Sequence, residues 1–142
     1  MAIITDIAEA VKDELNDSEF SQTFKAVRAY QPVYELPEMK TLHVTVVPRG
    51  VEVETSARNL VQHDYGIDVA VQKRFDKNEP DELDPLMTLV EEIIAFFRLR
   101  RLEDVPTAIC VKAANEPVYS PDHMEKFRQF TSVIRLTFRV VR

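Results

Sequence analysis

A stretch near the C-terminus alternates between apolar and other side chains, and it constrains the fold more than any other part of the sequence. Successive side chains of a β-strand point to opposite faces, so this pattern predicts a strand with one buried face. A register shift of one residue would place Arg135 and Arg139 in the core, so the register is strongly constrained. The inward-facing residues are Ile134, Leu136, Phe138 and Val140, and the outward-facing residues are Val133, Arg135, Thr137, Arg139 and Val141.

Two segments have the apolar spacing of amphipathic helices. The first runs from Ile4 to Leu15, and its single apolar stripe requires a packing surface such as a sheet. The second runs from Glu82 to Arg101 and has a wider apolar face. We expect Arg98, Arg100 and Arg101 at the C-terminal end of this long helix, where cations complement the helix dipole.

Several further segments have the pattern of strands. Residues 42–47 and 51–55 each alternate, and Pro48-Arg49-Gly50 between them predicts a hairpin turn. The extended segment from Thr23 to Tyr34 contains Pro32, which favours a sheet edge or a strand end. Other expected elements are strands at Asp64–Gln72 and Ala108–Ala113 and a polar loop at Asp76–Pro80. We also expect a short helix that Ser120 caps and Pro121 begins, with an apolar side formed by Met124, Phe127 and Phe130.

This order of elements predicts one α+β domain over residues 1–142. We expect a mostly antiparallel β-sheet, with an N-terminal helix, one long helix and one short helix packed largely on one face. The 142 residues, of which 45% are hydrophobic, are enough to build one core without disulfides or metals.

Charge and cysteine content exclude several classes of function. The net charge is −6 and the isoelectric point is near 5.1. Because nucleic-acid binding needs clustered lysine and arginine, we expect no direct binding to nucleic acid. The N-terminus has no basic region and no long apolar run, so we expect neither a signal peptide nor a membrane anchor. Cys110 is the single cysteine, and we expect a buried thiol in a strand and a reducing, cytoplasmic setting.

The sequence contains few residues arranged for catalysis. The two glycines, Gly50 and Gly66, lie in unrelated places, and neither belongs to a phosphate-binding loop or a nucleophile elbow. An acidic cluster before the long helix allows an acid/base pair, but acidic residues at a helix N-terminus more often complement the dipole. We therefore predict a protein that is not an enzyme and has no cofactor and no metal site. The residues weighed were Glu79, Asp81, Glu82 and Asp84, the histidines His43, His63 and His123, and the serines Ser56 and Ser132.

The whole chain resembles the tail terminator, or tail completion, proteins of tailed bacteriophages and related small neck and minor tail proteins. The points of likeness are the order of the elements, the segment His63-Asp64-Tyr65-Gly66-Ile67-Asp68-Val69 and the closing strand from Phe130 to Val140. The resemblance implies a structural virion protein, assembled in the host cytoplasm, that forms a homo-oligomeric ring, commonly a hexamer. Such a ring caps the tail tube, stops its polymerisation and faces the head connector. The implied partners are other copies of the chain, the tail tube protein, the head–tail connector or neck proteins and, in a contractile tail, the end of the sheath.

Three groups of residues are candidates for contacts between subunits or with the tube. Arginine forms bidentate pairs with carboxylates, which suits charged subunit interfaces. The candidate surfaces are the strand from Thr23 to Tyr34, the loop from Lys73 to Asp81 and the basic end of the long helix. The candidate residues on these surfaces are Arg28, Tyr30, Glu79, Asp81, Arg98, Arg100 and Arg101.

Three alternatives stay open at this point. A head–tail joining protein of the same neck has the same sequence features. A small acidic enzyme would use the carboxylate cluster, and a monomeric adaptor would bind peptides along an exposed sheet edge.

Overall fold

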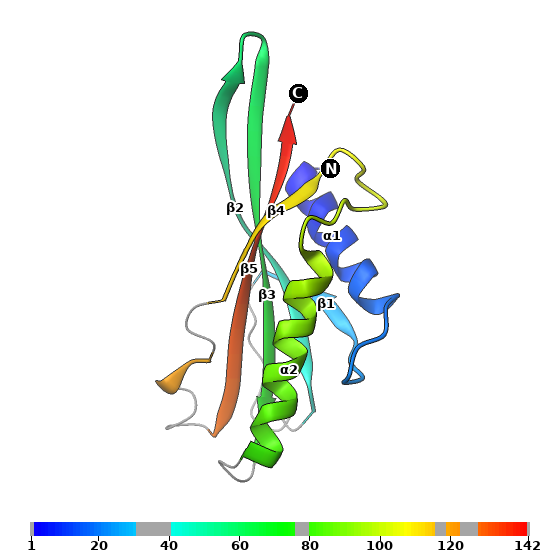
Figure 1. Ribbon diagram of the computed structural model, residues 1–142, viewed down its shortest axis with the longest axis vertical. Helices are drawn as coiled ribbons and strands as arrows, with labels where there is room; N and C mark the ends of the chain where they lie inside the picture. Colours follow the sequence, from blue (N-terminus) through cyan, green and yellow to red (C-terminus); the bar gives the residue numbers. More distant parts are fainter. Residues whose placement is uncertain (1, 31–40, 76–79, 116–118, 123–127, 142) are drawn as a thin grey trace.

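The computed structural model describes residues 2–30, 41–75, 80–115, 119–122 and 128–141, and it shows one five-stranded sheet with two helices. The sheet order is β1-β2-β3-β5-β4, and every neighbouring pair is antiparallel except β1 and β2. Both helices pack on the same face of the sheet (Figure 1), so the predicted α+β class is confirmed. The elements are α1 (Ile3–Asn16), β1 (Ala26–Arg28), β2 (His43–Ala57), β3 (Leu60–Arg74), α2 (Pro80–Phe97), β4 (Ile109–Ala114) and β5 (Gln129–Val141).

The closing strand β5 has the predicted register. Its four inward-facing residues are at most 3% exposed, and Arg135 is exposed on the other face. β5 lies between β3 and β4 and therefore forms part of the centre of the sheet. Phe130, predicted on a short helix, is instead a buried residue of β5, because the strand already begins at Gln129. Met124 and Phe127, also predicted on that helix, lie outside the described residues.

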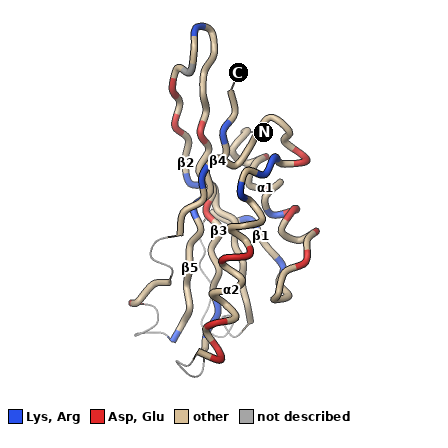
Figure 2. Tube along the Cα trace, in the orientation of Figure 1, with Lys and Arg blue, Asp and Glu red and all other residues tan. Residues whose placement is uncertain are grey.

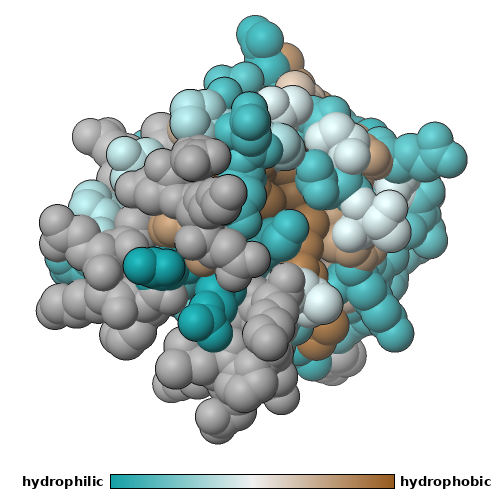
Figure 3. All heavy atoms as spheres, turned by 90° about the horizontal axis from the view of Figure 1, so that it is seen from below, coloured by the Kyte–Doolittle hydropathy of each residue, from teal (hydrophilic) through white to brown (hydrophobic). Residues whose placement is uncertain are grey.

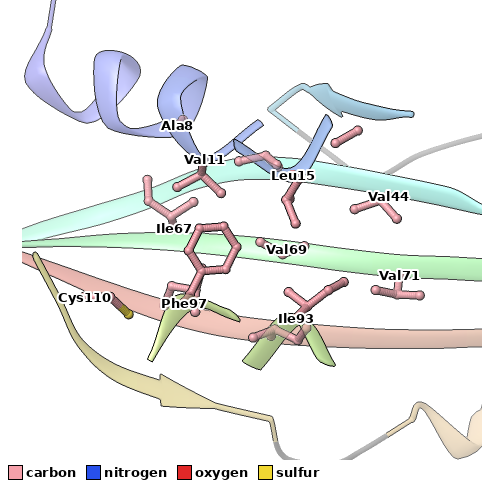
Figure 4. Packing of buried hydrophobic residues seen from close by; sticks show 14 of the residues in the cluster. Ala8, Val11, Leu15, Val44, Ile67, Val69, Val71, Ile93, Phe97 and Cys110 are labelled. Atoms are coloured by element: carbon pink, nitrogen blue, oxygen red, sulfur yellow. The ribbon is translucent and has the colours of Figure 1, made fainter. Parts of the chain in front are cut away.

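The core lies between the sheet and the two helices. α1 contributes Ala8, Val11 and Leu15, and α2 contributes Ile93 and Phe97 (Figure 4). Alternate residues of β2, β3 and β5 complete the cluster, as expected for strands with one buried face. The amphipathic helices predicted from residues 4–15 and 82 onward are thus confirmed in position and in their buried faces.

The long helix ends earlier than predicted, at Phe97 rather than Arg101. Leu99 adopts a left-handed conformation with φ 56°, which stops the helix and turns the chain toward β4. The Arg100 carbonyl then accepts the backbone N–H of Cys110, and Arg101 forms a β-bridge with Ile109. Arg98, Arg100 and Arg101 therefore follow the helix and do not form its last turn.

The hairpin turn predicted at Pro48-Arg49-Gly50 is wrong, because β2 continues through these residues. The chain turns at Arg58 and Asn59, and Asn59 has a left-handed φ of 69°. β1 pairs with β2 only as far as Val46, so Pro48 lies where β2 is an edge strand and its missing N–H is tolerated. The β2–β3 hairpin consequently has two strands of 15 residues each.

A β-bulge at Arg49 explains why the sequence pattern is that of a turn. The register shifts between Pro48 and Gly50, so Arg49 is an extra residue opposite β3. The apolar positions of β2 consequently change from even to odd numbers. The partners of these four valines in β3 all have odd numbers and therefore point to one face of the sheet, and directly paired residues share a face. Val51 and Val53 consequently lie on the same face as Val44 and Val46. The pairs are Val44 with Val71, Val46 with Val69, Val51 with Tyr65 and Val53 with His63.

The first strand is shorter than predicted within the described residues. β1 contains only Ala26–Arg28, whereas the prediction ran from Thr23 to Tyr34, and residues 31–40, including Pro32, lie outside the description. Asn16, the last residue of α1, positions this strand: its amide donates to the Ala26 carbonyl at 3.1 Å and accepts the Ala26 N–H at 2.7 Å.

The distal half of the β2–β3 hairpin, residues 51–63, projects beyond the helices, and we call it the arm (Figure 1). Seen from the opposite end of the molecule, hydrophobic residues of the described part form a strip near the centre of the view and scattered spots among hydrophilic residues (Figure 3). On the arm, by contrast, Val51 and Val53 are each more than half exposed. The arm therefore has an apolar side that no described element covers.

Candidate interaction surfaces

Arg28 and Tyr30, predicted as contact residues, lie together at the β1 edge of the sheet. The Arg28 guanidinium pairs with Glu9 of α1 and lies 5.6 Å from the centre of the Tyr30 ring. Glu9 also accepts from Lys12 at 2.7 Å, and the hydrogen bonds from Lys12 and Arg28 hold its pKa below the usual value. Arg28 thus ties α1 to β1, while Tyr30 is 72% exposed and free to contact another molecule.

The three arginines after α2 have different surroundings. Arg100 pairs with the buried Glu14 of α1, and its guanidinium lies 4.0 Å from the centre of the Phe96 ring. Arg101 donates to the Pro106 carbonyl at 2.6 Å. Arg98 is exposed beside β4. Arg100 therefore has an intramolecular role, and Arg98 is the arginine of this group most available to a partner.

The structure places the predicted contact residues of α2 and its surroundings at opposite ends of this helix. Asp81 is exposed in the first turn of α2, and the 18-residue helix separates it from Arg98 by roughly 25 Å at 1.5 Å per residue. Asp81 complements the helix dipole there, as expected. Glu79 lies outside the described residues. Whether any of these residues contacts another subunit stays a prediction.

The face of the sheet away from the helices contains a groove of about 770 Å³. Gly50 and Gly66 are direct cross-strand partners in this groove, so the prediction that they lie in unrelated places is wrong. Because Gly66 has no side chain, the Arg49 guanidinium lies over it, and a Cβ there would be 2.5 Å from the nearest Arg49 nitrogen. The absence of side chains at the two glycines therefore makes the groove deeper, and the absence of a Cβ at Gly66 leaves room for the Arg49 side chain.

Ion pairs cross the groove between neighbouring strands. Arg49 Nε lies 3.2 Å from Asp68 Oδ1, and Arg139 donates to both oxygens of Asp64, at 2.9 and 3.2 Å. The hydrogen bonds from Arg139 lower the pKa of Asp64, whereas burial raises the pKa of Asp68 despite the nearby arginines. Arg135 has no ion pair within the described part of the chain, so the groove has spare positive charge.

A second concavity, of about 440 Å³, lies on the helix side of the β4 edge. It lies between the end of α2 and β4, and we call it the β4 pocket. Leu99 is 67% exposed there, and Val111 is partly exposed beside it. The left-handed turn at Leu99 is what presents this leucine to solvent. The lining residues are Ile94, Arg98, Leu99, Cys110, Val111, Lys112 and Ala113.

The residues weighed for catalysis have structural surroundings. Asp64 pairs with Arg139 and not with His63, whose ring stacks on Tyr65. Ser132 is buried and accepts a hydrogen bond from the Asn115 amide at 2.9 Å. Among the described residues, no three histidine, cysteine or acidic side chains are grouped so that they could bind a metal.

Cys110 has the surroundings predicted for it. The residue is 1% exposed in β4, and burial raises the pKa of its thiol, which keeps it protonated and unreactive at neutral pH. No helix in the described part of the chain is long and apolar enough to cross a membrane.

The chain has no match among protein-family models or among curated protein sequences.

The sequence did not indicate the arm, the glycine pair or the β4 pocket. Glu52 and Glu54 of the arm have the same alternation as any half-buried strand, and only the bulge shows which side they face. Leu99 lies within an apparently helical pattern, so its exposure depends on the left-handed turn. The one available signal was the change of apolar phase at Pro48-Arg49-Gly50, which a turn and a bulge share.

Proposed function

We propose that this protein is a structural subunit of a tailed bacteriophage that forms a ring on the end of the tail tube. The ring stops polymerisation of the tube and offers a surface to the head connector. The observation that carries the proposal is the presence of two unlike open edges on one sheet, the arm on the β2 side and β4 on the other.

A closed ring needs contacts of this kind. Head-to-tail assembly joins two different surfaces of the same chain, and the assembly ends only when the rotation between copies closes. Beyond Val46, no described strand pairs with the outer edge of β2, and the bridge from Arg101 covers only the start of β4. Among the described residues, each edge therefore has backbone donors and acceptors with no strand partner, which a second strand could pair with.

The order of the elements also supports the proposal. The chain resembles tail terminator proteins in its sequence of an N-terminal helix, a meander, a long helix and an alternating closing strand. These elements lie in the same order in the fold. The acidic charge, net −6, fits a protein whose partners are proteins and not nucleic acid.

Deletion of the gene from its phage tests the proposed function. Without a terminator, electron micrographs should show headless tails that are longer than normal and variable in length, and a plasmid copy of the gene should restore both heads and length. Headless tails of normal length would instead assign the chain to head–tail joining. Normal virions would contradict both roles.

A further inference from the structure

We propose that the arm of one copy docks on the β4 edge and the β4 pocket of the next copy, so that the sheet continues from subunit to subunit. This inference rests on the proposed ring and names the surfaces that build it. The occupant of the β4 pocket is thus a second copy of this chain, which contributes residues 51–57 of β2.

The backbone leaves both surfaces open to each other. β1 pairs with β2 only at Val44–Val46, so within the described part of the chain no strand lies along the outer edge of the arm. β4 is the last strand on the opposite side of the sheet, and residues 111–114 have no further described strand beside them. A strand added at such an edge gains main-chain hydrogen bonds, and its side chains then determine specificity.

The side-chain patterns of the two edges match on each face. A sheet that continues across copies keeps its two faces, so residues on the helix side of one copy meet the helix side of the next. The bulge at Arg49 puts Val51 and Val53 on the helix side of the arm, and the β4 pocket with Leu99 opens on that same side. Without the bulge, Glu52 and Glu54 would face the pocket instead.

The apolar surfaces left uncovered on each partner are complementary. Val51 and Val53 are 51% and 56% exposed on the arm, and Leu99 is 67% exposed in the pocket. Ile94 and Val111 supply further apolar surface around Leu99. Burying such side chains against one another is the main favourable contribution in most protein association.

The charges on the other face are complementary too. Glu52 and Glu54 line the side of the arm away from the helices, and acidic residues mark the β2 side of the arm in Figure 2. Lys112 of β4 faces the same side of the sheet and has no ion pair within the described part of the chain. Opposite charges on the two edges favour a head-to-tail contact over a contact between two arms.

Cross-linking between single cysteines tests the docking directly. In a Cys110→Ala background, the full chain with Val53→Cys and Leu99→Cys is treated with a short bismaleimide and separated on a denaturing gel. Docking predicts a ladder of covalent multiples up to the size of the ring. A cross-link within one chain would leave the mass of that chain almost unchanged, so only cross-links between copies give a ladder.

A matched control uses the neighbouring position on the opposite face of the arm. Glu54→Cys with Leu99→Cys should cross-link much less, because residue 54 points away from the pocket. Equal ladders from residues 53 and 54, or no ladder from either pair in a chain that forms rings, would overturn the docking. Thermal unfolding of each variant checks that the fold is intact.

Charge reversal gives an independent test with a built-in rescue. Glu52→Lys with Glu54→Lys should weaken self-association about ten-fold or more, and Lys112→Glu should weaken it in the same direction. Combining the three changes should restore much of the affinity. The control Asp84→Lys with Glu91→Lys alters the net charge by the same amount on exposed positions of α2 and should have little effect.

These results separate the docking from the proposed function. Rings that form normally in both reversed variants, with no cross-link through residue 53, overturn the docking and leave the ring proposal standing. A native chain that stays monomeric at every concentration overturns both proposals.

Discussion

Replacement of Arg100 should destabilise the folded chain itself, because this arginine joins three separate parts of the structure. Its guanidinium pairs with Glu14 of α1 and stacks on Phe96 of α2. The second oxygen of Glu14 accepts the backbone N–H of Glu103 at 3.3 Å. The pair therefore fixes α1 against the chain that leads from α2 to β4.

The magnitude follows from the burial of the two partners. Glu14 is 7% exposed, so Arg100→Met leaves a buried carboxylate without its cation. Removing one partner of a buried ion pair costs about 3–5 kcal/mol. The Arg100 side chain is 31% exposed, so solvent screening reduces the expected loss to about 2–3 kcal/mol. For a domain of this size, that loss lowers the melting temperature by roughly 6–12 °C.

The assay is urea and thermal unfolding of three variants at one fixed protein concentration. Arg100→Met should lose the full amount. Glu14→Leu combined with Arg100→Met should lose less than the two single changes added together, because the pair is then replaced by apolar groups. Arg100→Met that unfolds like the native chain but no longer self-associates would refute this reasoning and return Arg100 to the subunit interface.

Three further changes test other parts of the structure. Gly66→Val should leave the free energy of unfolding within about 1 kcal/mol of the native value, because valine suits a strand. The new side chain should push Arg49 aside and weaken its ion pair with Asp68 across the groove. An NMR titration should then show a higher carboxyl pKa at Asp68 than in the native chain, and an unchanged pKa would contradict the placement of Arg49. Because folding lowers the pKa of Asp64, its ionised carboxylate stabilises the fold above the unfolded pKa, and this effect is lost as the pH falls through the lower folded pKa. The difference in the free energy of unfolding between the native chain and Asp64→Asn, measured with urea, should therefore shrink below about pH 4. A difference that stays constant with pH would exclude the ion pair as its source. Phe97→Ala should cost about 3–5 kcal/mol in urea unfolding, because the ring is fully buried against Phe138, and a loss below 1 kcal/mol would contradict the core packing.

Much of the fold could be predicted because its elements have a strong periodic pattern. β5 alternates without interruption, and its two outward arginines exclude the other register. The helices are long enough for their apolar stripes to be unambiguous. These patterns follow from local geometry, which a single sequence contains in full.

The remaining features depend on interactions between distant parts of the chain. A phase change at Pro48-Arg49-Gly50 is common to a turn and a bulge, and pairing with β3 decides between them. The end of α2 at Phe97 depends on the pairing of Arg100 and Arg101 with β4. The candidate surfaces were missed for the same reason, since residues 50 and 66 become neighbours only in the folded sheet.

The mass of the assembled native chain tests the central claim most directly. Native mass spectrometry of the full chain over a range of concentrations should show one closed multiple of the 16.4 kDa chain, with no larger multiples. Two unlike edges that meet in a closing rotation predict a single end point, and the resemblance to tail terminator proteins implies that it is a hexamer. A monomer at every concentration, or a series of multiples that grows without limit as the concentration rises, would contradict it.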